Sequence, residues 1–491
     1  VQIPKLFIGR PVMTTLVMVA IFTFGIIAYQ KLPVSDLPTV DYPTISVFAS
    51  LPGASPETMA ATVATPLEKS FSAIAGIDNI TSLSSLGSTS ITIQFSLDRD
   101  VDAAAQDVNA AISQTLAQLP PSILPPSYRK QNPAAAPILF LALTAKDMKL
   151  SDLDEYAETT IAQRLSMVSG VAQVSVFGSQ KYAVRIVLDP AQLAARNLSV
   201  SQVAQAVRTN NVTLPTGVLY GTTRTLTVQA TGQLYDATQF RSMVVAERNG
   251  APVHLGDLGR VFDDVQNDKT ASWYNGDRAI VLAVTRQPGT NTVEVADAAK
   301  AALAEIMPSL PPQVSMTIRY DRSVGIRQAV GDVKFSLLLA LALVVMVIFL
   351  FLRNLTATVI PSLTLPMAVV GTFAVMFVLG YSIDNLSLMA LTLAVGFVVD
   401  DAIVMLENIV RHLEMGKPAL QAALEGAKEV GFTIMSMTLS LAAVFIPLVF
   451  MAGIVGRLFR EFAVTIMISI LVSGFVSLTL TPMLCGRFLT S

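Results

Sequence analysis

Two adjacent carboxylates stand in the middle of an otherwise apolar stretch of this sequence. Asp400 and Asp401 lie within Leu386–Arg411, which reads LSLMALTLAVGFVVDDAIVMLENIVR. If the stretch is helical, Asp400 lies about 21 Å from Leu386 and roughly 13 Å from Ile409. That depth is inside a hydrocarbon core about 30 Å thick. A carboxylate there costs roughly 2.5–3.5 kcal/mol, so we expect the pair to have a function.

The chemistry available to such a pair is the binding and release of a proton. Burial and a second carboxylate nearby both favour the protonated form, whereas a cation from another helix favours the ionised form. Two charge states that prefer different helix packings are what a proton-coupled conformational change requires. A structural pair satisfied by neighbouring helices is the alternative. The centres of the predicted spans carry no Lys or Arg that could act as the counter-charge.

The composition is that of a membrane protein. The chain has 491 residues, of which 52% are hydrophobic and only 14% charged, and its mean hydropathy is +0.58. The net charge of −2 gives no field that would attract nucleic acid, and the single Cys485 excludes an intramolecular disulfide. A GxxxxGK[ST] loop and the HExxH, CxxC and GxSxG motifs are absent. We therefore expect neither an enzyme nor a bound metal, nucleotide or other cofactor.

Six hydrophobic stretches are long enough to span a membrane. They are Pro11–Gln30, Phe335–Leu352, Val359–Gly380, Leu386–Asn408, Phe432–Gly453 and Phe462–Gly486. Positive charge before the first span predicts a cytoplasmic N-terminus. Alternation then places most basic residues near the spans in the cytoplasm, namely Lys5, Arg10, Arg353, Arg411, Lys417, Lys428 and Arg487, whereas Arg457 and Arg460 fall in a short external loop.

The polar stretch from Lys31 to Lys334 predicts a large extracytoplasmic region. Its first part alternates as β-α-β-β-α from Tyr42 to Leu119, which is the order of a ferredoxin-like unit. A second copy starts at Ile138 and is completed only after an insert. We expect an α+β polytopic membrane protein with the divisions 1–31 (N-terminus and first helix), 32–135 (first unit), 136–177 with 277–330 (second unit), 178–276 (insert) and 331–491 (helices two to six).

Several segments resemble the resistance-nodulation-division (RND) transporters. Gly396, Asp400 and Glu407 fit the family's G-x3-D-x6-E motif, and GFVVDDAIVMLENI resembles the fourth helix of its multidrug efflux pumps. The resemblance extends over the chain, through VDYPTISVFASLPGASPETMAATVATPLE, FLFLRNLTATVIPSLTLPMAVVGTFAV, VLGYSIDNLSLMAL and GRLFREFAVTIMISILVSGFVSLTLTPMLCG. Among the pumps of the hydrophobe/amphiphile type, the wording is closest to the MdtB/MdtC branch, and to MdtC within it.

The resemblance implies a drug/proton antiporter in the inner membrane of a Gram-negative cell. Such a pump exports amphiphilic compounds, antibiotics among them, and uses the proton gradient without ATP or a cofactor. It works as a homotrimer or as a mixed trimer with a sibling subunit, together with a periplasmic adaptor and an outer-membrane channel. Asp400 and Asp401 match the family's proton relay.

The same resemblance implies roles for the parts of the periplasmic region. The two ferredoxin-like units resemble porter subdomains, the insert resembles a docking subdomain, and its hairpin Asn211–Arg224 resembles an arm that reaches a neighbouring protomer. Phe177 matches a phenylalanine of the family's drug pocket. Phe140 and Ile138 lie where further pocket residues are found, although Ile138 stands where an aromatic is common. Plain core packing of alternating strands is the other interpretation of these three.

The resemblance also implies a second half, because pumps of this type repeat the pattern of span, large loop and five spans. We therefore expect this chain to be the N-terminal half, with the missing C-terminal half supplying the lysine that faces the aspartates. Two alternatives have the same general plan. Protein-export factors of the SecD type carry a single aspartate in this helix, and metal-exporting RND pumps typically read VDAAIV where this chain reads VDDAIV. A membrane-anchored binding or sensing module is disfavoured by the buried pair.

Overall fold

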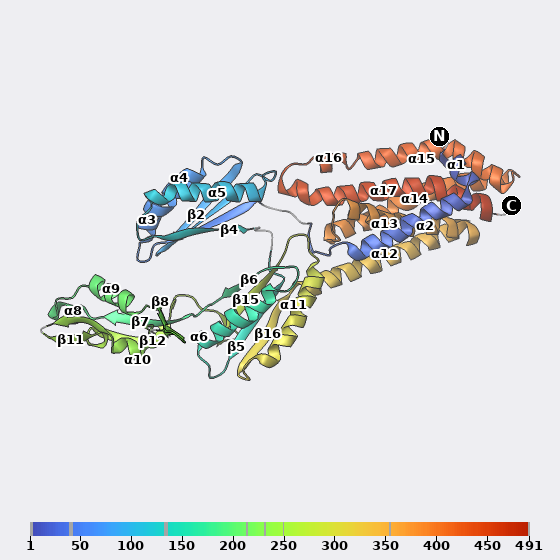
Figure 1. Cartoon of the computed structure of the whole chain (residues 1–491). Coiled ribbons are helices and arrows are strands. Elements are labelled where there is room, and N and C mark those ends of the chain that lie inside the picture. The colour runs from blue at the N-terminus through green and yellow to red at the C-terminus, as the bar shows by residue number, and fades with distance from the viewer. Residues whose placement is uncertain are drawn as a thin grey trace. The chain divides into compact units, whose positions relative to one another are not determined.

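A computed structural model describes residues 3–38, 43–131, 136–212, 215–229, 232–248, 250–352 and 355–489. The chain divides into two compact units (Figure 1). Unit 1 comprises Val1–Ile138, Thr285–Asp297 and Asp321–Ser491, and unit 2 comprises Leu139–Val284 and Ala298–Tyr320. Unit 1 contains a helix bundle and one β-sheet, and unit 2 is rich in β-structure.

Within the described residues, six helices of the bundle are long and apolar enough to cross a membrane. They are α2 (Pro11–Lys31), α12 (Arg322–Leu352), α13 (Leu355–Val378), α14 (Asn385–Glu414), α15 (Ala419–Ala443) and α17 (Gly453–Phe488). Each contains one of the predicted spans or most of it, so the expected polytopic membrane protein is confirmed. The helix α12 begins before the predicted span, because its polar first turns contain no proline that would end it. Arg353 lies outside the described residues.

The bundle helices pack closely where the side chains are small. A Cβ atom added to Gly25 of α2 would lie 2.2 Å from the carbonyl oxygen of Val370 in α13, so only glycine allows this approach. Pro361 and Pro366 lie inside α13 and Pro482 inside α17. Membrane helices tolerate proline because neighbouring groups satisfy the freed carbonyls. The helices α14 and α17 pack against each other more extensively than any other pair of elements, which places these two helices at the centre.

The two ends of the bundle differ in what they carry. At one end, here called the sheet end, α2 ends and α12 and α14 begin. The segment after α2 forms a short parallel bridge there: Ser35 N donates to Ile383 O (3.0 Å) and Ile383 N donates to Pro33 O (2.9 Å). The opposite end, here called the terminus end, contains the short helix α1 (Ile3–Gly9) and the last turns of α14 and α17.

The sheet of unit 1 is antiparallel, with the strand order β2-β3-β1-β4. Its elements are β1 (Thr44–Ser50), α3 (Pro56–Met59), a π-helical turn (Ala60–Ala64), α4 (Thr65–Phe71), β2 (Ile77–Ser85), β3 (Ser88–Phe95), α5 (Val101–Thr115) and β4 (Leu124–Gln131). Ser55 caps the first helix by accepting from Thr58 N. The first residue of the predicted strand, at position 42, lies outside the described residues.

The strand β4 was not expected from the sequence. The predicted β-α-β-β-α order stops at Leu119, whereas the proline-rich segment after it continues as β4 along β1. Pro125 and Pro126 are compatible with this strand because β4 lies at the edge of the sheet, where a missing N–H leaves no partner unsatisfied. Burial alternates along β3, and Phe71 and Phe95 are fully buried in the core beneath the sheet.

The second sheet has the strand order β16-β5-β15-β6. Its elements are β5 (Leu139–Ala145), α6 (Leu150–Glu155), a π-helical segment (Tyr156–Ala162), α7 (Gln163–Ser166), β6 (Val171–Phe177), β15 (Ile280–Arg286), α11 (Thr292–Ile306) and β16 (Val314–Asp321). The long chain segment between β6 and β15 is the expected insert. Both halves of the split pattern therefore contribute to one sheet.

The insert has its own core around Leu255, Leu258 and Val261. It contains β7 (Tyr182–Leu188) paired with β12 (Gly259–Val265), the helices α8 (Pro190–Ala195), α9 (Val200–Asn210) and α10 (Ala237–Arg241), and the strand pairs β8 (Pro215–Tyr220) with β9 (Thr225–Gln229), β10 (Val244–Arg248) with β11 (Ala251–His254), and β13 (Trp273–Tyr274) with β14 (Asp277–Arg278).

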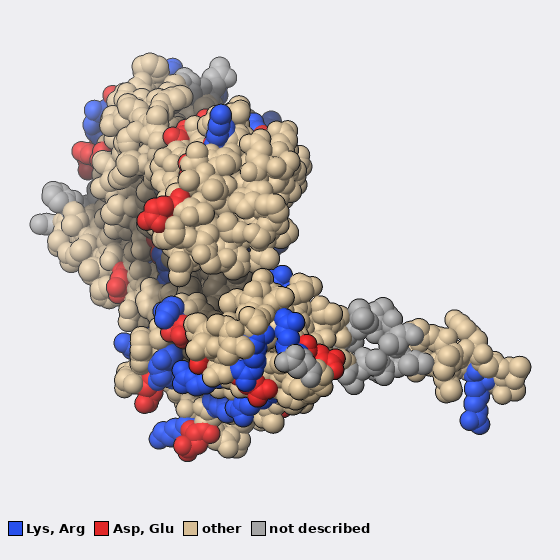
Figure 2. Space-filling view, turned by 90° about the vertical axis from the view of Figure 1, so that its left-hand side faces the viewer, with Lys and Arg blue, Asp and Glu red and all other residues tan. Residues whose placement is uncertain are grey.

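The hairpin β8–β9 corresponds to the predicted arm. Its second strand extends past Arg224, where the predicted hairpin ends, and positions 213 and 214 lie outside the described residues. Leu219, Tyr220 and Leu226 are largely exposed on it. Figure 2 shows one face of the molecule with a slender projection. Lys and Arg are interspersed with Asp and Glu on the surface beside this projection. The hairpin therefore presents apolar side chains at its surface in this structure.

Candidate functional site

The predicted carboxylate pair lies at the midpoint of α14, one of the two central helices. Asp400 is about 22 Å from the first residue of the helix and roughly 21 Å from its last. Consecutive residues of an α-helix point about 100° apart, so the two carboxylates face different neighbours. Asp401 is buried, with 6% of its surface exposed. Asp400 is exposed within the described part of the chain.

Asp401 faces α15 and receives one hydrogen bond from it. Thr438 donates from its hydroxyl to Asp401 Oδ2 at 3.0 Å. The helix α17 closes the same site, because a Cβ on Gly474 would lie 2.7 Å from Thr438 Oγ1. Ser473 donates to the carbonyl oxygen of Val398 at 2.6 Å, which joins α17 to α14 one turn before Asp401. Three helices therefore meet at this carboxylate.

Asp400 lines a groove of about 270 Å³ between α12 and α14. The other lining side chains are aliphatic, and a Cβ on Gly396 would meet nothing within 4 Å, so the motif glycine keeps the groove open. Within the described residues, neither Asp400 nor Asp401 has an ion-pair partner. An ionised carboxylate in such apolar surroundings is costly, and a proton or an added cation would remove the cost. The arrangement can therefore alternate between a protonated and an ionised state.

The remaining motif residue, Glu407, lies two turns beyond Asp400 and is exposed in the described structure. Its neighbour Asn408 is buried and donates from its side-chain amide to the carbonyl oxygen of Gly426 in α15 at 2.9 Å. A Cβ on Gly426 would lie 3.1 Å from Ile409, so the two helices are in close contact here. The structure thus holds α14 against α15 on the terminus side of the aspartates.

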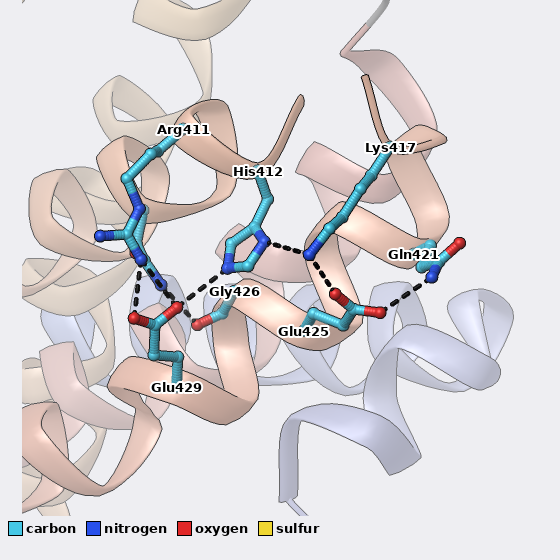
Figure 3. A network of polar contacts seen from close by, with 8 residues as sticks. Arg411, His412, Lys417, Gln421, Glu425, Gly426 and Glu429 are labelled. Carbon is cyan, nitrogen blue, oxygen red and sulfur yellow. Dashed lines mark hydrogen bonds and ion pairs between the residues drawn. The ribbon is translucent and has the colours of Figure 1, made fainter. Parts of the chain in front are cut away.

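A charged network fixes the last turn of α14 (Figure 3). Arg411 donates to both carboxylate oxygens of Glu429 at 2.7 and 2.8 Å. His412 lies between Glu429 and Lys417: its Nε2 is 2.9 Å from Glu429 Oε2, and its Nδ1 is 2.9 Å from Lys417 Nζ. An ammonium group can only donate, so Nδ1 accepts and Nε2–H donates to Glu429. Lys417 also pairs with Glu425, which accepts from Gln421.

The opposite end of α14 is held by a different group. Asp384 is fully buried and caps the helix, because its Oδ1 accepts from Leu386 N at 2.8 Å and from Ser387 N at 2.9 Å. Ser382 Oγ lies 2.9 Å from Asp384 Oδ2 and 3.5 Å from Oε2 of Glu461 in α17. One hydroxyl hydrogen thus stands between two carboxyl groups. Within the described residues, neither has an ion-pair partner.

The three predicted pocket residues occupy different environments. Phe177 ends β6 and is 52% exposed, whereas Ile138 is 1% exposed and packs in the interior. Phe140 is partly buried, with its ring centroid 6.1 Å from that of Tyr320. The sheet places β15 between the strands of Phe140 and Phe177. Only Phe177 has the exposure that a ligand contact requires in this conformation, and the role of all three stays a prediction.

The sequence interpretation missed Thr438, Ser473, Asp384 and Glu461. Thr438 and Ser473 are hydroxyl residues in apolar spans, which are common, so their type alone does not single them out. The sequence does contain one signal for Glu461 and Ser473, which is their spacing. Polar residues recur every four positions along α17, starting at Glu461.

Comparison with known families gives one match. The family model described as the AcrB/AcrD/AcrF family matches residues 3–491. The matched region contains the aspartate pair, the six candidate spans and both sheets. This match lends no support to the expected missing half, which stays a prediction. Members of this family are transporters rather than enzymes. The chain belongs to the AcrB/AcrD/AcrF family of RND transporters.

Proposed function

We propose that this chain is part of a drug/proton antiporter, a multidrug efflux pump that exports amphiphilic compounds. The observation that carries the proposal is the pair Asp400 and Asp401 at the midpoint of a central helix, one facing Thr438 and the other an open apolar groove. A transporter needs an element whose packing depends on its energy source. A carboxylate pair with two charge states is such an element for a proton gradient, and ATP or another cofactor has no role in it.

The energy-coupling step follows from the two environments. When Asp401 is neutral, it fits the apolar contact with α15 and α17 and keeps its bond from Thr438. When it is ionised, the desolvation cost favours any rearrangement that brings a cation or water to the carboxylate. Asp400 opens to the groove where such a cation would arrive. Proton binding and release therefore favour different packings of α14 against α15 and α17.

The orientation follows from the distribution of basic residues. The terminus end carries the basic cluster of Lys5, Arg10, Arg411, Lys417 and Arg487, which supports a cytoplasmic position by the positive-inside rule. The sheet end then faces the periplasm of a Gram-negative cell, with the bundle in the inner membrane. Protons would enter from the sheet end and leave at the terminus end.

The β-rich regions would handle the drug and the partners. The two four-stranded sheets fit ferredoxin-like porter subdomains, and Phe177, Phe140 and Ile138 are the residues that we propose for the drug pocket. The insert fits a docking subdomain, whose exposed hairpin β8–β9 would reach a neighbouring protomer in a homotrimer or mixed trimer. A periplasmic adaptor and an outer-membrane channel would complete the path. The sequence segments that resemble the family favour the MdtB/MdtC branch.

The test is to remove one ionisable group at a time. Asp400→Asn and Asp401→Asn are expected to abolish drug resistance in a strain that lacks its own pumps. The Asp401→Asn side chain keeps an oxygen that can accept from Thr438, so folding and assembly should be retained. The matched control is Glu414→Gln, which removes the carboxyl group of an exposed residue at the end of the same helix, away from the pair. Resistance that persists in either aspartate variant, at normal expression, would rule out the proposed relay.

A further inference from the structure

Buried polar side chains recur at four-residue intervals along α17. Glu461 is followed by the hydroxyl residues Thr465, Ser469 and Ser473, and the same spacing continues through Ser477, Thr481 and Cys485. The hydroxyl residues of this series are at most 1% exposed. Hydroxyls in an apolar helix are ordinarily satisfied by the carbonyl four residues earlier, as Thr479 is by Phe475 at 2.6 Å.

The series begins at the carboxyl group that shares Ser382 with Asp384. The titratable and charged groups around Glu461 are Asp384, Tyr381 and the neighbouring Arg460. Asp384 already accepts three hydrogen bonds, from two backbone N–H groups and Ser382, which is the environment of an ionised cap. A second ionised carboxylate beside it would be repelled at close range. One proton held by Glu461 resolves the repulsion.

The series reaches the aspartate pair at its fourth member, Ser473. Ser469 Oγ lies 3.0 Å from Thr372 Oγ1 of α13, and Ser473 donates to Val398 O of α14. The next residue, Gly474, is in contact with Thr438, which donates to Asp401. From Glu461 to Ser473 the helix rises about 18 Å. The polar groups thus extend from the sheet end of the bundle to its centre.

Three members of the series, Thr465, Ser477 and Thr481, are buried without a hydrogen-bond partner within the described residues, and Thr465 is the one between Glu461 and the aspartates. Within the described residues, Thr465 Oγ1 is buried and makes no hydrogen bond, not even to its own helix. A buried hydroxyl without a partner costs about 1–3 kcal/mol. Successive members lie about 6 Å apart along the axis, which is roughly the span of two hydrogen bonds through one water molecule. Water molecules on either side of Thr465 would therefore satisfy it and connect it with Glu461 and with Ser469.

We propose that Glu461, together with Asp384, is a proton-binding site at the sheet end, and that Thr465, Ser469 and Ser473 with water molecules between them carry the proton from it to Asp401. The inference rests on the proposed proton coupling. At each step an oxygen accepts one proton and releases another, so the hydroxyls are unchanged. The transfer breaks the O–H bond of Glu461 and forms one on Asp401. Glu461 then regains a proton from the aqueous side.

The first test detects the bound proton without requiring transport. Infrared spectra of the purified full-length protein at neutral pH are expected to show the C=O band of a protonated carboxyl group, and Glu461→Gln should remove its contribution. Glu407→Gln, which changes an exposed glutamate on α14, should leave the band intact. If the spectrum of Glu461→Gln equals that of the wild type, Glu461 holds no proton and the proposal fails.

The second test measures proton movement in liposomes that contain the purified protein, with a pH-sensitive dye and an added amphiphilic drug. Thr465→Val is expected to slow drug-dependent proton uptake severalfold, and Thr465→Ser to restore it. Thr479→Val is the matched control, because it removes a buried hydroxyl from the same helix off the series. Melting temperatures verify that each variant is folded.

The outcomes separate the two proposals. One outcome is that the wild type takes up protons with the drug and that Thr465→Val and Thr479→Val take them up at the same rate. The proposed route is then wrong, whereas the proposed antiport is supported. If Thr465→Ser is as slow as Thr465→Val, the residue acts through packing and the route is likewise wrong. If the wild type itself moves no protons with drug, the proposed function fails.

Discussion

The two ends of α14 are anchored by opposite kinds of electrostatics. At the terminus end, cationic side chains of Arg411 and Lys417 meet Glu425 and Glu429, with His412 between them (Figure 3). At the sheet end, Asp384 and Glu461 share one serine hydroxyl and, among the described residues, form no ion pair. One end of the helix is charge-compensated and the other is not.

This difference indicates that the two ends of α14 have different roles. A compensated network has one favoured state over a wide pH range, because every charge has a partner, and it suits a fixed attachment. Two carboxyl groups without a cation have two states that differ by one proton, and their contact depends on which is populated. The aspartate pair lies between these ends. We expect α14 to be held at the terminus end and adjustable at the sheet end.

The largest effect on stability is expected at Asp384, where two variants separate the helix cap from the charge of the carboxylate. Asp384→Ala removes the acceptor of two backbone N–H groups at the start of α14, and should cost about 2 kcal/mol of stability. Asp384→Asn keeps an oxygen for the cap and should lose much less. Thermal unfolding of the detergent-solubilised protein gives the comparison. Equal losses in both variants would mean that the charge, rather than the cap, stabilises this end.

A smaller effect is expected at the terminus end. His412→Phe preserves the ring volume but removes the donor to Glu429 and the acceptor of Lys417, which should cost about 1 kcal/mol. The cost is limited because Glu429 and Lys417 are partly exposed and can bind water instead. The same melting assay applies. A loss greater than that of Asp384→Ala would reverse the proposed order of the two anchors.

The smallest effect on stability is expected at Asp154, which extends the comparison of carboxyl groups to the β-rich part of the chain. Asp154 in unit 2 is buried, accepts from Ser179 at 2.8 Å and, within the described residues, has no partner for its Oδ1. Burial raises the pKa of Asp154 above its ordinary value, against the hydrogen bond from Ser179, which lowers it. Its chemistry therefore resembles that of the sheet end, at a site outside the bundle.

The raised pKa fixes the sign of the pH dependence. The native state binds the proton of Asp154 more tightly than the unfolded chain, so this group favours folding in acid and the contribution is lost as pH rises through the native pKa. Asp154→Asn should therefore raise the melting temperature slightly at neutral pH and lose that advantage near pH 4. Melting curves against pH test this. A variant less stable than the wild type at neutral pH would contradict it.

The sequence predicted features that depend on local pattern. The depth of Asp400 and Asp401 followed from the length of an apolar run, and the split second sheet from strands that alternate on either side of an insert. The strand β4 was missed because two prolines obscure its pattern, and only its position at the sheet edge permits them. The contact of Asp384 with Glu461 joins distant parts of the chain. Tertiary packing alone brings them together, as it does Thr438 and Asp401.

The short bridge between Val34 and Ile383 has a mechanical consequence. Ile383 immediately precedes the cap of α14, and Val34 follows α2 on the chain that continues to the first sheet. The carbonyl oxygen of Val34 also accepts from Thr292 N at 2.9 Å, at the first residue of α11. A displacement of α14 along its axis must therefore stretch these backbone bonds or pull the linker of the first sheet and the start of α11 along with it.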